Sequence, residues 1–181
     1  MKPPRAESAA RLTAASAFDI RAHRTGLIAL LQATVVGGAP LGFLHPVSDA
    51  DADAYWDRVA ASVDRRERIV IVAFEGDRLV GAVQVELAAN QNARHRASVQ
   101  KLAVVPELRG RGIGRALMRS AEDEARRAGR TLLVLDTREG GYAERFYEDL
   151  GWIRSGRIPD FMRDEAGHPH AAIVFHKNLA S

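Results

Sequence analysis

The chain contains no cysteine among its 181 residues. Disulfide bridges, thiolate zinc sites and catalysis through a covalent cysteine intermediate are therefore excluded. The sequence also lacks any apolar run approaching the ~20 residues that a membrane-spanning helix needs. Residues 1–16 contain no apolar segment of the kind found in secretory signals. We therefore expect a cytoplasmic protein that does not bind membranes.

Neither sign of charge dominates the sequence. The 26 basic and 23 acidic residues leave a formal net charge of +3. This balance offers no broad basic stripe, so we expect no nucleic-acid partner. Two histidines in one turn, His168 and His170, do not by themselves make a metal site, and we expect none. No Gly-x-Ser-x-Gly elbow occurs, which disfavours a serine hydrolase.

Length and composition predict a single domain. A chain of 181 residues, 46% of them hydrophobic, is long enough to bury roughly 70% of the surface that the unfolded chain exposes. The sequence has neither internal repeats nor a second domain. Residues 1–16 are basic and alanine-rich and read as a flexible leader, so the domain is expected over residues 17–181.

Glycine and arginine are concentrated in residues 109–115, which read Arg-Gly-Arg-Gly-Ile-Gly-Arg. This stretch follows an apolar run at residues 102–105. It precedes a pattern at residues 113–128 in which apolar side chains recur three or four positions apart. The predicted order is strand, glycine-rich loop and helix. Free N–H groups of a first helical turn, the helix dipole and three arginines together favour binding of an anion such as phosphate.

Two nucleotide-binding motifs are excluded at this loop. A P-loop requires a Lys-Ser/Thr pair, which is absent here. A Gly-x-Gly-x-x-Gly motif that began at Gly110 would need glycine where Arg115 stands. Asp136 lies where a ribose contact would be sought, about 20 residues further on, but this is a single coincidence. An arginine-rich helix start on a solvated face is the alternative that the loop alone leaves open.

Hydrophobic periodicity and turn residues predict one mixed sheet with helices on both faces. The expected strands are residues 18–20, 69–74, 79–87, 94–104, 131–135, 152–153 and 171–176. The expected helices are residues 23–36, a segment capped by Ser48, residues 112–128 and residues 143–150. Short turns between the second, third and fourth strands predict an antiparallel meander, whereas the helix at residues 112–128 predicts a parallel crossover.

Two separated motifs resemble the GNAT superfamily of N-acetyltransferases. Residues 99–118 are similar to motif A of that family, whose core is Arg/Gln-x-x-Gly-x-Gly/Ala, and Arg109, Gly112 and Gly114 match the core. Residues 143–152 are similar to motif B. The resemblance runs from about residue 69 to the C-terminus and extends more loosely over the N-terminal helices.

Three shorter segments, at residues 95–102, 135–137 and 156–160, look closest to the tabtoxin-resistance branch of this family, which acetylates small antibiotic-like amines. The superfamily resemblance implies an α/β (α+β) mixed-sheet fold. In that fold an antiparallel meander joins a parallel pair of strands that splays apart, with helices on both faces.

The resemblance also implies acetyl-CoA as cosubstrate and implies no metal. The pantetheine arm would lie between the splayed strands, and the N–H of Val104 would stabilise the oxyanion formed when an amine attacks the thioester. Main-chain groups near Leu102, Ala103 and Val104 would pair with the arm. The pyrophosphate would lie on the glycine-rich loop, at Arg109, Gly110, Arg111, Gly112, Ile113, Gly114 and Arg115.

Tyr147 stands at the tyrosine position of the family, which implies that it protonates the leaving thiolate. The alternative is that Phe146 and Tyr147 only pack their helix on the sheet. One departure concerns the same region: Gly140 stands where the family often has asparagine. Contact with the cofactor there would then fall to Tyr142 or to the main chain.

Asp136 is a candidate general base or a ligand for the acceptor ammonium, because it follows a buried strand beside the expected site. The alternative is a turn cap, a common role of aspartate at strand ends. Glu86 and His95 are candidate substrate-binding residues, although each is also typical of a solvated strand edge. Phe43, in the loop after the first helix, is expected either in the core or in a wall of the substrate site.

These features predict transfer of the acetyl group of acetyl-CoA to a primary amine of a small, antibiotic- or toxin-like molecule by direct attack in a ternary complex. Two alternatives stay open. One is a protein or peptide N-acetyltransferase of the same fold, and the other is a non-catalytic acyl-CoA-binding module. Family analogy and the frequency of two-fold oligomers favour a homodimer.

Overall fold

The computed structural model describes residues 10–39 and 41–179, which form a seven-stranded mixed sheet in the order β1-β2-β3-β4-β5-β7-β6. Its strands are β1 (Arg11–Ala15), β2 (Arg68–Glu75), β3 (Arg78–Leu87), β4 (Arg96–Val104), β5 (Leu132–Arg138), β6 (Ile153–Arg163) and β7 (Pro169–Asn178). The helices are α1 (Ala17–Ala22), α2 (Arg24–Val36), α3 (Asp49–Asp64), α4 (Ile113–Arg127) and α5 (Tyr142–Glu148), with short 3₁₀ turns η1 (Gln91–Ala93) and η2 (Pro106–Leu108).

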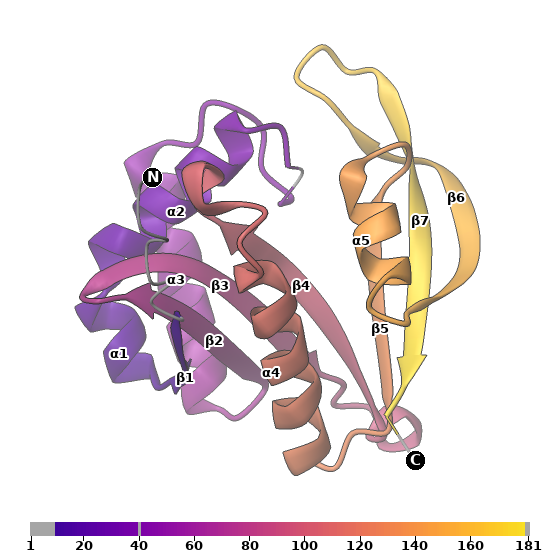
Figure 1. Cartoon of the computed structure of the whole chain (residues 1–181), viewed down its shortest axis with the longest axis horizontal. Helices are drawn as coiled ribbons and strands as arrows, with labels where there is room; N and C mark the ends of the chain where they lie inside the picture. The colour runs from indigo at the N-terminus through magenta and orange to yellow at the C-terminus, as the bar shows by residue number, and fades with distance from the viewer. Residues whose placement is uncertain (1–9, 40, 180–181) are drawn as a thin grey trace, which may run out of the picture.

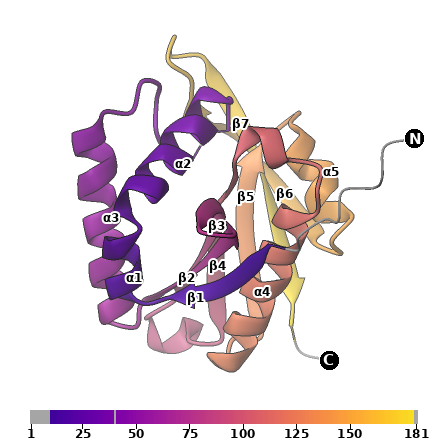
Figure 2. The ribbon, with the colours of Figure 1, turned by 60° about the vertical axis from the view of Figure 1, so that its left-hand side comes forward.

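Helices cover both faces of the sheet. The first three helices lie on one face, while α4 and α5 lie on the other (Figures 1 and 2). The strands between them carry the apolar core, in which the side chains of Ile71, Val83, Leu133 and Phe175 are fully buried. Within the described residues no helix has the length and apolar character needed to cross a membrane.

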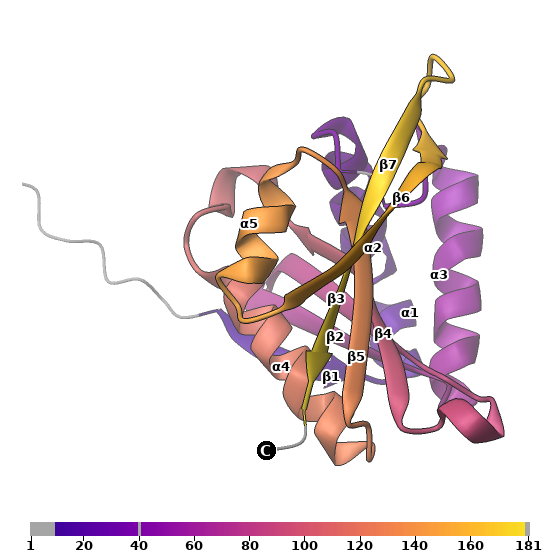
Figure 3. The ribbon, with the colours of Figure 1, turned by 90° about the vertical axis from the view of Figure 1, so that its right-hand side faces the viewer.

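The parallel pair β4–β5 is short. The two strands pair only from Arg96 opposite Leu132 to Ser98 opposite Val134. Beyond that point they diverge, and their far ends lie well apart (Figures 1 and 3). We call the region between residues 99–104 of β4 and residues 135–138 of β5 the splay. The predicted antiparallel meander and splayed parallel pair are confirmed.

A bulge in β4 accompanies the splay. Gln84 of β3 pairs with Gln100 and Ala82 pairs with Ala103, so β4 uses three steps where β3 uses two. The extra residue is Lys101, whose φ of 56° lies in the left-handed region. A bulge bends and twists its strand. It therefore explains why β4 follows β3 to its end but leaves β5 after a few residues.

The N-terminal expectations were partly wrong. Residues 11–15 belong to β1, which pairs with β2, so the flexible leader predicted over residues 1–16 does not extend through them. The strand predicted at residues 18–20 is the helix α1. Ser16 caps this helix by accepting from the N–H of Asp19, whose carboxylate accepts in return from the N–H of Ser16. This capping box outweighs the strand pattern of three residues. Residues 1–9 lie outside the described part.

The C-terminal hairpin is longer than predicted. Pro159 lies within β6, where a register shift between Ile158 and Met162 accommodates it, and not in the connecting loop. In the turn, Asp164 Oδ2 lies within hydrogen-bond distance of two histidine ring nitrogens, 3.2 Å from His168 Nδ1 and 3.1 Å from His170 Nε2. Among the described residues, no group of three or more histidine, cysteine, aspartate or glutamate side chains is placed to hold a metal ion.

A buried ion pair joins α4 to the last strand. Glu122 is only 6% exposed. Its two carboxylate oxygens accept hydrogen bonds from Lys177 Nζ at 2.8 and 2.9 Å, and Oε1 accepts another from Trp152 Nε1 at 3.2 Å. Lys177 Nζ also donates to the carbonyl of Leu150 at 2.7 Å. These bonds tie α4, the end of α5 and β7 together, and so fix the wall of the splay that β5 and β7 form.

Replacing Lys177 by methionine should lower the free energy of unfolding by about 3 kcal/mol, because the buried Glu122 carboxylate loses its countercharge. Arg127→Ala is the matched control. It removes the exposed pair with Glu124, and we expect a loss below about 0.5 kcal/mol. Urea unfolding followed by circular dichroism measures both. Equal effects of the two variants would show that burial does not set the strength of the Glu122–Lys177 pair.

Candidate active site

The glycine-rich loop lies where η2 turns into α4, at the open end of the splay (Figure 1). Gly110 and Gly112 have φ values of 77° and 84°, in the left-handed region that favours glycine. Gly112 is the N-cap of α4 and supplies no side chain to cap its first turn. Residues 109–112 are exposed. The first N–H groups of the 15-residue helix α4 therefore face solvent beside a loop with two glycines in the left-handed conformation. This arrangement suits a phosphate.

Gly114 has a different environment. It is helical, and a Cβ atom added to it would lie 3.5 Å from the ring of Phe146 and 3.8 Å from the side chain of Val104, both ordinary contact distances. The start of α4 thus packs close to α5 and β4 without requiring glycine at this position. Tyr142, which is 83% exposed, stacks on Phe146 with ring centroids 6.3 Å apart. These two aromatic rings line the α5 side of the loop.

Along the splay, the main-chain groups on one edge of β4 do not pair with β5. The N–H of Val105 donates to the carbonyl of Val80 on β3 at 3.0 Å. Because main-chain groups of successive residues point to opposite edges of a strand, Val104 and Leu102 direct theirs into the splay. Ala103 directs its own toward β3. In agreement, the carbonyl of Val104 accepts from Arg109 Nε at 3.3 Å.

Asp136 lies inside β5 and not at its end. The register of Ser98 with Val134, extended by two residues, places Asp136 across the splay from Gln100 and Lys101. Leu135 pairs with Phe175, which packs against Tyr147 of α5, so the side chain of Asp136 extends from the opposite face of the sheet, where it is exposed. Partial burial raises the pKa of Asp136, and the nearby Lys101 charge acts in the opposite direction.

Tyr147 lies on the other face, in α5, and is 9% exposed. Its ring packs against Trp152 and Phe175, with centroids 6.1 and 5.9 Å away. Burial and then the charge of Asp136 raise the pKa of Tyr147 to about 12. The phenol is therefore protonated at neutral pH and can donate a proton, whereas it cannot serve as a base.

A row of polar side chains, of which only Glu86 was predicted to be functional, crosses the sheet under α3. Gln84 is 1% exposed, and its Oε1 accepts from Tyr55 OH at 3.0 Å and from Arg68 Nη1 at 2.5 Å. Glu86 accepts from Gln100 Nε2 at 2.6 Å and pairs with Arg68 at 3.4 Å. We call these side chains together with Lys101 the polar row. Its sequence signal is the occurrence of Gln84 and Glu86 on one face of an otherwise apolar strand.

The structure thus separates the two predicted substrate-binding residues. Glu86 belongs to the polar row, which leads to Asp136 through Gln100 and Lys101. His95 precedes β4 at the closed end of the parallel pair, where its carbonyl accepts from Thr131 and Leu132. It lies at the opposite end of β4 from the glycine-rich loop, so we leave it out of the proposed site.

The comparisons with known proteins agree with this geometry. The sequence pattern of the Acetyltransferase (GNAT) family matches residues 38–152, more than half of the chain. N-alpha-acetyltransferase 30 of Schizosaccharomyces pombe is 34% identical over 88 residues, which make up 48% of this chain and 59% of that protein. The aminoalkylphosphonate N-acetyltransferase of Salmonella typhimurium is 31% identical over 110 residues, 60% of this chain and 71% of that relative.

Among solved structures, that of yncA from Salmonella typhimurium, determined with its cofactor acetyl-CoA, has the same fold. The TM-score is 0.76 at 20% sequence identity, and the alignment covers 96% of each chain.

Two glycines of the loop should respond differently to the same substitution. Gly112→Ala places a Cβ atom on a left-handed residue and should lower the free energy of unfolding by about 1 kcal/mol. Gly114→Ala adds a methyl group at ordinary contact distance in a helix and should change it by less than about 0.5 kcal/mol. Urea unfolding without any ligand measures both. A larger loss for Gly114→Ala would contradict the assignment of conformational strain to Gly112.

Proposed function

Because the chain belongs to the GNAT family of acetyltransferases, we propose that it transfers the acetyl group of acetyl-CoA to a primary amine of a small molecule. The observation that carries the proposal is the splay. Pairing of β4 with β5 ends at Ser98, next to the strand from which Asp136 extends, and Asp136 is near enough to Tyr147 for its charge to raise the pKa of the phenol, which supports a shared site.

The residues present fit acetyl-CoA. Gly110 and Gly112 hold the loop in the conformation that exposes the N–H groups at the start of α4, where a pyrophosphate binds. Arg109, Arg111 and Arg115 add positive charge. The main chain of Leu102 and Val104 offers donors and acceptors to an extended arm lying along β4. Tyr142 and Phe146 line the side of the cofactor site that α5 forms. Gly140, just before α5, contributes no side chain to this contact.

Acetyl-CoA supplies the acetyl group as a thioester, and the chain supplies the polar groups around it. The N–H of Val104 donates to the oxygen on which negative charge develops. The bulge at Lys101 places the N–H of Leu102 at the same edge, nearer the level of Asp136. Asp136 binds the acceptor ammonium or accepts its proton, and its raised pKa suits proton transfer. Tyr147 donates its phenolic proton to the departing thiolate.

Two finer features belong to the same proposal. The acceptor is a small antibiotic- or toxin-like amine, as the resemblance to the tabtoxin-resistance branch predicts. The C-terminal hairpin supports a closed site, because Glu165 at its tip accepts from the N–H of His45, in the loop between α2 and α3, at 3.3 Å. A cytoplasmic location and a homodimer stay predictions.

A protein N-terminus is the second candidate acceptor, favoured by the likeness to N-alpha-acetyltransferase 30. Such an acceptor needs a groove open at both ends so that a peptide can pass through it. The contact between the loop at His45 and the hairpin at Glu165 bridges the face on which Asp136 lies. This contact is our reason for preferring a small acceptor.

The direct test of the function is acetyl-CoA-dependent release of free thiol with a panel of small primary amines and short peptides. We expect acetyl-CoA at millimolar concentration to raise the melting temperature, since a ligand that binds only the folded state stabilises it. Thiol release should appear with a subset of the small amines. Acetylation of peptides alone would replace the small-molecule acceptor by the peptide one, and no thermal shift would overturn acetyl-CoA binding.

Replacing Tyr147 by phenylalanine should lower kcat about 100-fold or more, because it removes the proton donor. Affinity for acetyl-CoA, measured by calorimetry, should stay within about twofold, since the ring and its packing remain. Because the pKa of Tyr147 is raised to about 12, the wild-type enzyme should show no loss of rate from this group below about pH 11. Unchanged turnover in Tyr147→Phe would leave Tyr147 only a packing role.

A further inference from the structure

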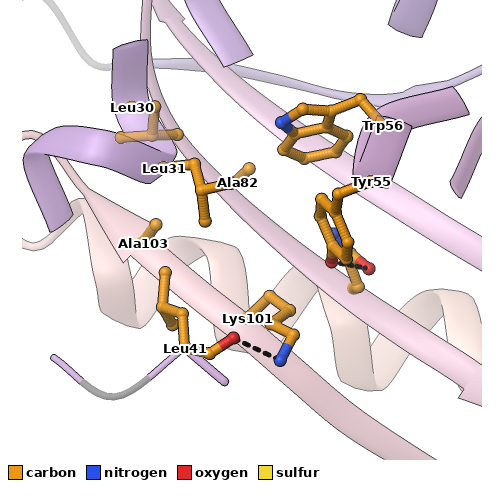
Figure 4. Close-up of a pocket in the computed structure, with 9 residues that line it drawn as sticks. Leu30, Leu31, Leu41, Tyr55, Trp56, Ala82, Lys101 and Ala103 are labelled. Carbon is orange, nitrogen blue, oxygen red and sulfur yellow. Dashed lines mark hydrogen bonds between the residues drawn. The ribbon is translucent and has the colours of Figure 1, made fainter. Parts of the chain in front are cut away.

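Lys101 stands out among the basic residues of the chain. Only three of the 26 basic residues are lysines, at positions 2, 101 and 177. Lys101 is the bulged residue of β4 and is directed to the face under α2 and α3. Its Nζ donates to the carbonyl of Leu41 (Figure 4). The same Nζ lies 6.0 Å from the ring centre of Phe43.

The loop at residues 41–43 approaches this ammonium closely. A Cβ atom on Gly42 would lie 2.9 Å from Lys101 Nζ, so a larger residue there would displace the end of the lysine side chain. The φ of 77° at Gly42 independently favours glycine. An ammonium has three donors, and within the described residues the carbonyl of Leu41 accounts for one of them.

A small cavity of about 10 Å³ lies behind Lys101, between the first helices and the sheet (Figure 4). Its lining includes Lys101 with Trp56 and Gln84. In the part of the chain that the structure describes, Trp56 Nε1 and Gln84 Nε2 are buried donors without a partner. Their residues are 3% and 1% exposed. Buried donors without an acceptor are costly, so this corner of the site favours an oxygen acceptor.

Carboxylates flank Lys101 on both sides. Asp136 lies across the splay and Glu86 lies along the polar row. Burial and then the charge of Arg68 lower the pKa of Lys101, whereas the charges of Asp136 and Glu86 act in the opposite direction and favour its ammonium form. Arg68, the other cation nearby, is already engaged by Gln84 and Glu86. The sheet face under α2 and α3 therefore presents the Lys101 ammonium, which has spare donors, next to the Asp136 carboxylate, which suits an amine. Together the two groups are complementary to a molecule that carries both a positive and a negative charge.

We propose that the acceptor carries an acidic group, a carboxylate or phosphonate, in addition to its amine, and that Lys101 binds that group. The inference rests on the proposed function, which it deepens by naming the class of acceptor. The amine lies at Asp136, beside the acetyl group, while an acidic oxygen accepts from Lys101 Nζ. The unpartnered N–H donors of Gln84 and Trp56 make the wall behind Lys101 electropositive, and such a wall also favours a negatively charged group.

Matched pairs of acceptors test this inference. The acidic members are β-alanine, methionine and 2-aminoethylphosphonate, and the neutral partners are β-alaninamide, methioninamide and ethanolamine. We expect the wild-type enzyme to prefer the acidic member of the best pair. Lys101→Met should lower kcat/KM for that member roughly 10- to 100-fold, the range of one charge-assisted hydrogen bond. It should leave the neutral partner within about threefold.

Lys101→Arg separates charge from structure. It keeps a cation at the bulge and should retain most of the preference, whereas an altered loop at Leu41 would affect acidic and neutral acceptors alike in both variants. Acetyl-CoA affinity, measured by calorimetry, should be the same in all three proteins. A wild type that prefers neutral amines, or a Lys101→Met variant that loses activity equally on both members of a pair, would overturn the inference while leaving the proposed function in place.

A direct binding measurement tests the inference in the case where the proposed function itself fails. If acetyl-CoA binds but no amine is acetylated, the proposed function fails, and calorimetric titration of the same pairs then decides the inference. Binding of the acidic members that weakens at least tenfold in Lys101→Met would support it. Equal binding of acidic and neutral members, or none by either, would refute it.

Discussion

The early end of pairing between β4 and β5 is the constraint on which the rest of the site depends. Parallel strands normally continue side by side, because main-chain N–H and C=O groups left without partners are costly. Here the bulge at Lys101 bends β4 away after Ser98, and the main chain of Leu102 and Val104 is left facing a gap. Arg109 partly satisfies that edge through its bond to the carbonyl of Val104. In the proposed function, an extended arm of the cofactor would satisfy it more fully.

The same bulge divides the site between the two faces of the sheet. On the α4 and α5 face lie the glycine-rich loop, the Phe146 contact and Tyr147, all suited to holding and using a cofactor. On the α2 and α3 face lie Asp136, Lys101 and the polar row, which suit an acceptor. In the proposed function, the two reactants would enter from opposite faces and meet at the β4 edge, as direct transfer in a ternary complex requires.

Rigid surroundings keep this opening in place. The Glu122–Lys177 pair ties α4 to β7, and Trp152 joins it from the beginning of the last hairpin. The ring of Phe146 packs α5 close to the start of α4 at Gly114. A gap between strands therefore persists because each wall is anchored by contacts of its own, and not because the strands are free to move apart.

Much of the fold could be predicted from local sequence patterns. The meander, the crossover and the positions of α2, α4 and α5 follow from hydrophobic periods and turn residues, which act over a few positions. The helix α1 was missed because its signal is the capping box of Ser16 and Asp19, whereas the alternation around Phe18 looked like a strand. The strand β1 was missed because an edge strand of five residues carries little pattern of its own.

The loop that opens α4 could also be predicted, since Arg109, Gly112 and Gly114 lie close together in the sequence and glycines at such spacing are typical of a loop before a helix. The acceptor side could not. His95 and Asp136 look equivalent as polar residues at strand ends, but only the register of β4 with β5 shows that Asp136 faces the splay and His95 lies at the closed end.

The sequence by itself determined the mixed α/β architecture, the glycine-rich anion loop and the aromatic helix that follows it, because each is encoded in neighbouring residues. Only the tertiary structure decided which side chains face one another across the splay. Lys101, Gln84 and Tyr55 come from three elements far apart in the chain, and they meet because of a one-residue bulge and the packing of α3 on the sheet. No local pattern reports such a meeting, since strand register and helix packing are set by the whole core.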